Sequence, residues 1–182
     1  VTGSTTFSLS AVDDLNGIGI NPVNASAYRI RNSTYSSGWQ ILPNGTSLVL
    51  LGRSDGQYSI DYNSSDKFGN VETIKTQVVV LDNTAPATSN NYDLLWHNAN
   101  FAVTLTGTDS GSGLSNIYYK LNGGSTKSVS ADGQPQIAIE SASNTLEYWS
   151  ADNLGFEELP HKMLTGIRLD KTVPTGTIIV NS

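Results

Sequence analysis

The sequence predicts an all-β protein built from two tandem β-sandwich domains. Three observations lead to this prediction. A set of short motifs occurs twice in the same order along the 182 residues, apolar residues alternate with polar ones in short runs, and Gly, Asn and Asp gather between the runs. No long stretch has the spacing of apolar residues that a helix requires.

The two copies of the motif set define the expected domains. The offsets between matched positions are 96, 91, 86 and 88 residues, so the order is kept and only loop lengths differ. The matched positions are Asp13 with Asp109, Tyr28 with Tyr119, Asp66 with Asp152, and Asp82 with Asp170. We therefore predict one domain over residues 1–86, a second over residues 87–174, and the first strand of a truncated third repeat over residues 175–182.

The expected strands alternate inward-facing apolar residues with Ser, Thr, Gln and Lys that face water. In chain order, the inward-facing sets are Phe7/Leu9/Ala11, Tyr58/Ile60/Tyr62, Val79/Leu81, Phe101/Val103/Leu105, Ile117/Tyr119/Leu121, Ile137/Ile139, Leu146/Tyr148 and Ile167/Leu169. About seven short strands in roughly 90 residues is typical of an immunoglobulin-like sandwich. Two closed barrels are the less favoured alternative, because each would be very small.

Two segments of the first repeat carry a resemblance. Residues 62–72 read YNSSDKFGNVE and residues 81–86 read LDNTAP, which resembles the closing half of bacterial and archaeal immunoglobulin-like repeats of extracellular proteins. Residues 96–124 resemble the opening half of the same repeat. The resemblance implies immunoglobulin-like domains in an extracellular setting, as in surface-layer or adhesin-type tandem repeats. The second repeat departs from the pattern where Phe156 replaces Asn70, so its closing turn is expected to differ.

The composition excludes several classes of function. Charged residues make up 14% of the chain, against about 25% in an average soluble domain, and the net charge is −6. An acidic chain of this kind lacks the cationic face that nucleic acid requires. The absence of Cys excludes disulfides and thiolate metal sites, and no apolar run approaches the length of a membrane span. Because the chain begins with Val, we expect it to be a piece of a longer protein.

We do not expect an enzyme. His97 and His161 are the only histidines, and neither lies in a motif for a catalytic triad or a metal-ligand pair. Adjacent carboxylates occur at Asp13-Asp14 and at Glu157-Glu158, but a glycosidase needs its two carboxylates on either side of a substrate cleft. We therefore assign no catalytic and no cofactor-binding residues.

Calcium is the one cofactor that the residues favour. Asp recurs at matched Gly-rich turns and at both repeat junctions, and Ca²⁺ prefers oxygen ligands. The candidate ligands are Asp13, Asp66, Glu72, Asp82, Asp109, Asp152, Glu158 and Asp170. Asp13 with Asp66, and Asp109 with Asp152, are the preferred pairs. The alternative is that these Asp residues only accept backbone N–H bonds in tight turns.

The sequence favours a structural role over a binding role. We expect a segment of a large secreted or cell-surface prokaryotic protein, an S-layer or adhesin-like stalk whose partners are neighbouring repeats and other surface proteins or glycans. The alternative is a carbohydrate- or protein-binding accessory module of an extracellular enzyme. Trp149 is the candidate sugar ligand-binding residue, because it follows the inward-facing Tyr148 and should lie exposed on the outer face of its strand.

Overall fold

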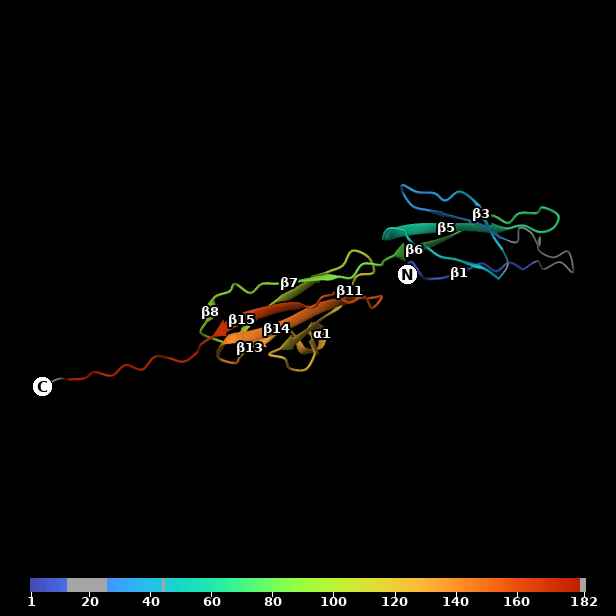
Figure 1. Cartoon of the computed structure of the whole chain (residues 1–182). Helices are drawn as coiled ribbons and strands as arrows, with labels where there is room; N and C mark the ends of the chain where they lie inside the picture. The colour runs from blue at the N-terminus through green and yellow to red at the C-terminus, as the bar shows by residue number, and fades with distance from the viewer. Residues whose placement is uncertain (13–25, 44, 181–182) are drawn as a thin grey trace. The chain divides into compact units, whose positions relative to one another are not determined.

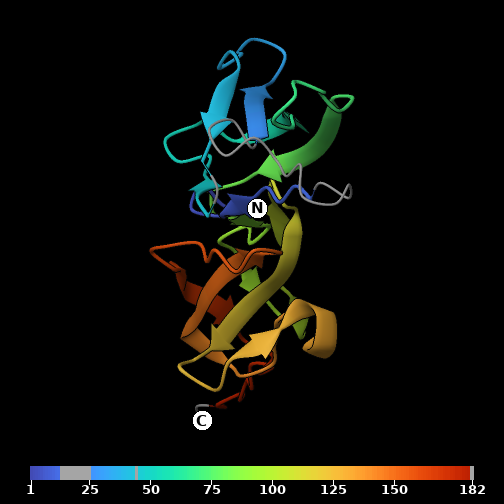
Figure 2. The ribbon, with the colours of Figure 1, turned by 90° about the vertical axis from the view of Figure 1, so that its right-hand side faces the viewer.

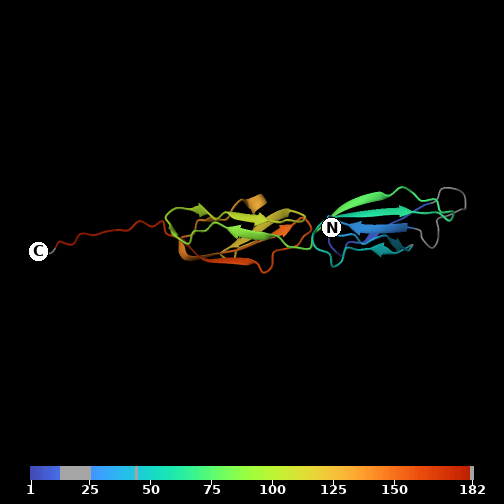
Figure 3. The ribbon, with the colours of Figure 1, turned by 90° about the horizontal axis from the view of Figure 1, so that it is seen from above.

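The computed structural model describes residues 1–12, 26–43 and 45–180. The chain divides into two compact units, Val1–Thr84 and Ala85–Ser182, which we call unit 1 and unit 2. Both are built from β-strands, and the prediction of an all-β sandwich protein is confirmed. The predicted domain limits at residues 86 and 174 stay predictions. No strand is assigned over residues 170–180, which leave the paired strands of unit 2 (Figure 3).

Unit 1 contains an antiparallel sheet of four strands in the order β3-β2-β5-β6 (Figure 1). These strands are β2 (Ser26–Arg31), β3 (Gln40–Leu42), β5 (Gly56–Ser64) and β6 (Lys75–Leu81). A short second sheet pairs β1 (Phe7–Ser8) with β4 (Ser47–Leu48). Alternate residues of the larger sheet, including Ile30, Ile60 and Leu81, pack with Leu48 and Leu50 in one apolar core.

Unit 2 contains a sheet of five strands in the order β12-β11-β14-β15-β8. These are β8 (Trp96–His97), β11 (Leu114–Leu121), β12 (Lys127–Ser128), β14 (Ser141–Asp152) and β15 (Lys162–Leu169). Only the β15–β8 pair is parallel. The opposite layer consists of β7 (Ala87–Asn90) paired with β10 (Leu105–Thr108), and β9 (Phe101–Ala102) paired with β13 (Gln136–Ile137).

The core of unit 2 joins these two layers. Val103 and Leu105 come from one side, and Tyr119, Leu146 and Ile167 from the five-stranded sheet. Most inward positions follow the predicted alternation. Ile139 does not: it is 60% exposed, because β13 ends at Ile137 and the period of two no longer applies beyond it.

One helix occurs among the described residues, and the sequence pattern does not predict it. It is the single turn α1 (Val129–Asp132), which lies between β12 and β13 at the edge of unit 2 (Figure 2). Asp132 closes the turn, because its Oδ2 accepts the backbone N–H of Ser128 at 2.9 Å. A helix this short is below the length that periodicity can detect. In the described part of the chain, no helix is long and apolar enough to cross a membrane.

A buried carboxylate stabilises the outer face of the unit 1 sheet. Asp61 on β5 is only 1% exposed, and it accepts hydrogen bonds from Arg29 and Arg31 at 2.7 Å and from Thr76 at 2.7 Å. The hydrogen bond from Arg31 is the largest reason why the pKa of Asp61 lies well below its usual range. The sequence pattern does not reveal this site, because period two puts Asp61 on the outer face without saying what covers it.

We predict that Asp61→Asn destabilises unit 1 by about 3 kcal/mol at neutral pH, because it leaves two guanidinium groups without their shared carboxylate. The pKa of Asp61 is lower in the folded chain than in the unfolded one. The ion-pair contribution is therefore complete above about pH 5 and is lost as the pH falls toward the folded-state pKa. Urea unfolding should show the difference between parent and variant narrowing by about 1 kcal/mol between pH 7 and pH 3.

Thr76→Val is the matched control for this prediction, since it removes one hydrogen bond to Asp61 and leaves the charges in place. We expect it to cost about 1 kcal/mol with little dependence on pH. A parent-to-Asp61→Asn difference that stays constant from pH 7 to pH 3 would show that the carboxylate charge contributes nothing to folding.

Candidate metal centre

The turn after β5 shows how unit 1 uses the Asp of its D-x-x-G motif. Asp66 Oδ1 accepts the backbone N–H groups of Phe68 and Asn70, both at 2.8 Å, and Oδ2 accepts the side-chain N–H of Asn70 at 2.7 Å. Gly69 closes the turn with a φ of 85°, which side chains rarely adopt. The side-chain bond from Asn70 is the main reason why the pKa of Asp66 is lowered. Both carboxylate oxygens of Asp66 are therefore occupied.

The turn after β14 in unit 2 has the same backbone. Asp152 Oδ1 accepts the N–H groups of Leu154 at 2.9 Å and Phe156 at 2.7 Å, and Gly155 has a φ of 88°. Asp152 N donates to Phe156 O at 3.1 Å, as Asp66 N donates to Asn70 O at 3.0 Å. The repeat seen in the sequence thus extends to the hydrogen bonds of the turn.

The two turns differ at the second carboxylate oxygen. Phe156 occupies the position of Asn70 and offers no side-chain donor. Asp152 is 3% exposed, and its Oδ2 is buried without a hydrogen-bond partner among the described residues. A buried carboxylate oxygen without a partner raises the free energy of the folded state, because its hydrogen bonds to water are lost and no other hydrogen bond replaces them. This oxygen is therefore the one polar atom of the turn that a bound cation would satisfy.

Asp109 lies beside it. A carboxylate oxygen of Asp109 lies within 4.8 Å of one of Asp152. Asp109 follows β10, and its Oδ2 accepts the N–H groups of Gly111 at 3.1 Å and Gly113 at 2.6 Å. Asn153 ties the two loops together, since its backbone N–H donates to Gly113 O at 3.0 Å. A Cβ on Gly113 would lie 3.3 Å from the Asn153 side chain, so Gly lets the loops approach closely.

The geometry of this pair suits a hard cation. Ca²⁺–oxygen distances are about 2.3–2.6 Å, so two oxygens on one ion can be up to about 5 Å apart. Both donors are carboxylates, and the ligand type is the one that Ca²⁺ and Mg²⁺ prefer. The sequence comparison of the repeats selects the same two residues. Their metal-binding role stays a prediction.

The remaining candidate ligands have other partners or fall outside this pair. Glu72 pairs with Lys75 at 2.6 Å. Asp82 and Asp170 each accept the N–H of the Thr two residues later, at 3.1 and 2.9 Å. Asp13 lies outside the described residues. The structure does not bring Glu72 or Asp170 to the pair, and the metal role of these residues also stays a prediction.

Glu158 is buried and anchors β7. Both of its carboxylate oxygens accept the N–H of Thr88 at 3.0 Å, and Oε1 pairs with Lys162 at 2.9 Å. Burial raises the pKa of Glu158, but the hydrogen bonds from Lys162 and Thr88 outweigh it, and the pKa is lowered. The backbone N–H of Glu158 donates to Ser150 O of β14 at 2.9 Å. The hydrogen bonds of Glu158 therefore join β14 and β7 and leave its carboxylate little capacity for a metal.

The predicted exposure of Trp149 is wrong. The residue lies on the outer face of β14, as its alternation with Tyr148 predicts, but it is only 6% exposed. The ring of His161 stacks on it at a centroid distance of 4.0 Å and an interplanar angle of 1°. His161 is held there by Glu147, whose Oε1 lies 2.8 Å from Nδ1. A period of two indicates the face of a strand, but a later segment of the chain covers that face.

We predict that His161→Ala exposes Trp149. With Trp39 and Trp96 replaced by Phe, Trp149 is the single Trp fluorophore. Its emission should shift to the red and its quenching by iodide should increase, because the covering ring is gone. The variant should lose about 1 kcal/mol of stability from the ring pair. Unchanged emission and quenching would mean that other groups bury Trp149. Its proposed sugar-binding role stays a prediction that requires such an opening.

Comparison with protein-family models gives no match, and neither does comparison with curated proteins. Several solved structures match this chain, among them the following three. Fibronectin(III)-like modules of CbhA from Clostridium thermocellum are 11% identical, with 85% of this chain and 84% of that chain covered and a TM-score of 0.38. A tetra-tandem repeat from the extending region of a large adhesion protein is 17% identical, with 84% and 43% covered and a TM-score of 0.33.

The third is a Ca²⁺-stabilized adhesin that helps an Antarctic bacterium to bind ice. It is 14% identical, with 83% of this chain and 41% of that chain covered and a TM-score of 0.31. This chain spans less than half the length of the two adhesin chains. At these low TM-scores the assignment of the fold depends on the strand pairing and the cores of this chain itself.

Proposed function

We propose that this chain is a structural segment of a large secreted or cell-surface prokaryotic protein, an S-layer or adhesin-like stalk of tandem immunoglobulin-like repeats. The repeated order of motifs and the repeated turn geometry support this role, because a chain built from successive copies of one folded unit gains length with each copy. Its partners are then neighbouring repeats of the same parent chain and other surface proteins or glycans. The proposal includes no catalytic activity.

We also propose that Ca²⁺ stabilises unit 2 by binding between Asp109 and Asp152. This proposal rests on two observations: Oδ2 of Asp152 is buried without a hydrogen-bond partner among the described residues, and a carboxylate oxygen of Asp152 lies within 4.8 Å of one of Asp109. Two carboxylates at this distance repel each other, and a cation removes the repulsion. Two residues supply at most four of the six to eight oxygens that Ca²⁺ needs, so water completes the coordination. Such a site is weak, in the 10⁻⁴–10⁻³ M range common for extracellular modules.

We predict a calcium-dependent melting temperature. At ten times the dissociation constant, binding adds about 1.4 kcal/mol to the stability of unit 2, which raises its midpoint by roughly 5–10 °C. Thermal melts of the whole chain in EDTA and in several millimolar CaCl₂ measure this shift. Asp152→Asn should abolish it. In EDTA this variant should be no less stable than the parent, because the carboxylate repulsion is gone.

Asp66→Asn is the matched control. It alters the equivalent turn of unit 1, where both carboxylate oxygens already accept hydrogen bonds. We expect it to lower stability by about 1–2 kcal/mol in EDTA and in calcium alike, and to keep the calcium response of the parent. If the parent midpoint does not move with calcium, or if Asp152→Asn responds like the parent, the aspartates are turn residues only.

We further propose that the two repeats fold independently. Each unit has its own apolar core of buried strand residues. A fragment ending at Asn83 should therefore unfold in one cooperative thermal transition, measured by circular dichroism. A fragment that binds a dye for exposed apolar surface and melts without cooperativity would show that the boundary is misplaced.

A further inference from the structure

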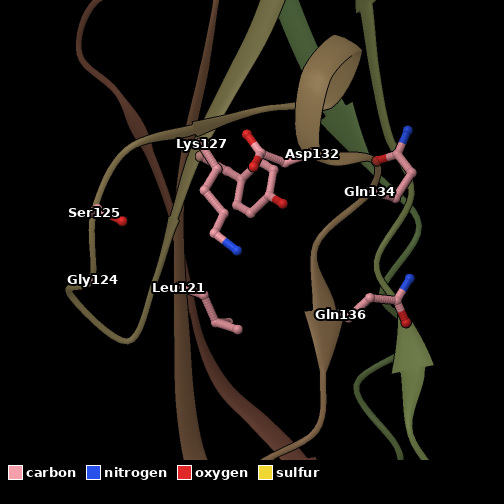
Figure 4. Close-up of a pocket in the computed structure, with 8 residues that line it drawn as sticks. Leu121, Gly124, Ser125, Lys127, Asp132, Gln134 and Gln136 are labelled. Carbon is pink, nitrogen blue, oxygen red and sulfur yellow. The ribbon is translucent and has the colours of Figure 1, made fainter.

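A polar hollow of about 290 Å³ lies in unit 2 beside the helix α1. Figure 4 shows its labelled residues coming from both sides: Leu121 and Lys127 from β11 and β12, and Gln134 and Gln136 from the chain that follows α1. Its volume is near the lower limit for ligand pockets, which fits a group the size of one sugar ring. Neither Asp109 nor Asp152 lines it, so it is separate from the candidate metal centre.

Part of the wall is fixed by hydrogen bonds within the unit. Gln134 Oε1 accepts the N–H of Leu105 at 2.8 Å, and its Nε2 donates to Leu105 O at 3.2 Å. Asp132 Oδ2 accepts the N–H of Ser128 at 2.9 Å. These bonds leave Asp132 Oδ1 as an acceptor for a ligand, and they hold the two sides of the hollow in place without a ligand.

Other polar groups of the hollow have no partner. Within the part of the chain that the structure describes, no hydrogen bond or ion pair involves the side chains of Ser125, Lys127 or Gln136. Tyr119 also lines the hollow, and no hydrogen bond joins its hydroxyl to another described residue. The residue as a whole is 4% exposed, but its hydroxyl is not among the buried polar atoms, so it is open to the hollow and available to a ligand. Burial raises the pKa of Tyr119, with a smaller contribution from the charge of Asp132, so the phenol stays neutral and can donate.

We propose that this hollow binds one neutral sugar residue of a glycan. Sugar hydroxyls both donate and accept hydrogen bonds, and the hollow offers donors at Lys127, both functions at Tyr119, and an acceptor at Asp132. The charges of Lys127 and Asp132 cancel, which disfavours an anionic ligand. Leu121 adds an apolar contact for the C–H face of a ring. The site goes beyond the proposed structural role, and it is distinct from Trp149, which is covered.

The hydrogen-bonding groups explain why the hollow would select this ligand. A ligand that fills the hollow takes its polar groups away from water, and every group that it leaves without a hydrogen bond then costs free energy. An apolar ligand would leave Tyr119, Lys127 and Gln136 unpaired. A sugar ring satisfies them and needs no movement of the wall, because Asp132 and Gln134 are already held.

The test is a titration of the whole ¹⁵N-labelled chain, followed by NMR, with the methyl glycosides of glucose, galactose, mannose and N-acetylglucosamine. At least one glycoside should cause saturable shifts concentrated in residues 119–136, and a tetrasaccharide of the same sugar should bind at least as tightly. Tyr119→Phe and Lys127→Met should each weaken binding by about tenfold, because each removes one hydrogen-bonding group. The titration is run once in EDTA and once in calcium. Equal sugar affinity in both would show that sugar binding does not depend on the proposed metal site.

Lys120→Met is the matched control. Lys120 follows Tyr119 on β11, but it pairs with Glu147 and does not line the hollow. It should bind the glycoside like the parent. Three results would overturn the proposal: no saturable shift with any of the four glycosides, equal affinity of the parent and both hollow variants, or tighter binding of glucuronate or phosphate than of the neutral glycosides. Failure of the tetrasaccharide to bind would overturn the glycan as the source of the sugar.

Discussion

The structure depends on how its tight turns satisfy their backbone N–H groups. Sandwich units with few charges and no disulfides must reverse the chain often, and each reversal leaves donors that no strand can pair. In both units an Asp carboxylate oxygen accepts two of these donors, at Asp66 and at Asp152, and Asp109 does the same after β10. Because the strands that meet at these turns carry the core residues, the register of each sheet depends on these carboxylates.

The turns at Asp66 and Asp152 differ at the second carboxylate oxygen, Oδ2. Asn70 occupies it in unit 1, so that turn is complete within the chain. Phe156 offers no donor in unit 2, so Oδ2 of Asp152 is buried without a hydrogen-bond partner among the described residues. A carboxylate oxygen of Asp152 also lies within 4.8 Å of one of Asp109. A single change of residue type thus leaves the hydrogen bonds of the turn to Oδ1 intact and leaves Oδ2 without a partner, which is the feature behind the proposed metal centre. This difference explains why we propose a metal site at Asp152 in unit 2 and not at Asp66 in unit 1, where both carboxylate oxygens already accept hydrogen bonds.

The sequence reveals what depends on local pattern and repetition. The all-β fold, most inward positions and the pairing of Asp109 with Asp152 follow from period two and from aligning the repeats. The burial of Trp149 does not, because His161 reaches it from another segment, and the burial of Asp61 depends on Arg side chains from a neighbouring strand. The hollow beside α1 has no sequence signature, since its polar groups belong to separate strands and a helix of one turn.

The two proposed sites use different parts of unit 2, and this has a physical consequence. The proposed metal centre would stabilise the folded state, because a cation would offset a repulsion that exists only when the two loops are together. The hollow has walls that hydrogen bonds to Leu105 and Ser128 hold in the absence of a ligand. Calcium should therefore change the stability of the unit, and with it the fraction of chains able to bind a sugar near the melting temperature, while the affinity of the folded hollow stays the same. If both proposals hold, the affinity of the hollow for a sugar is constant as calcium varies, as long as the unit stays folded.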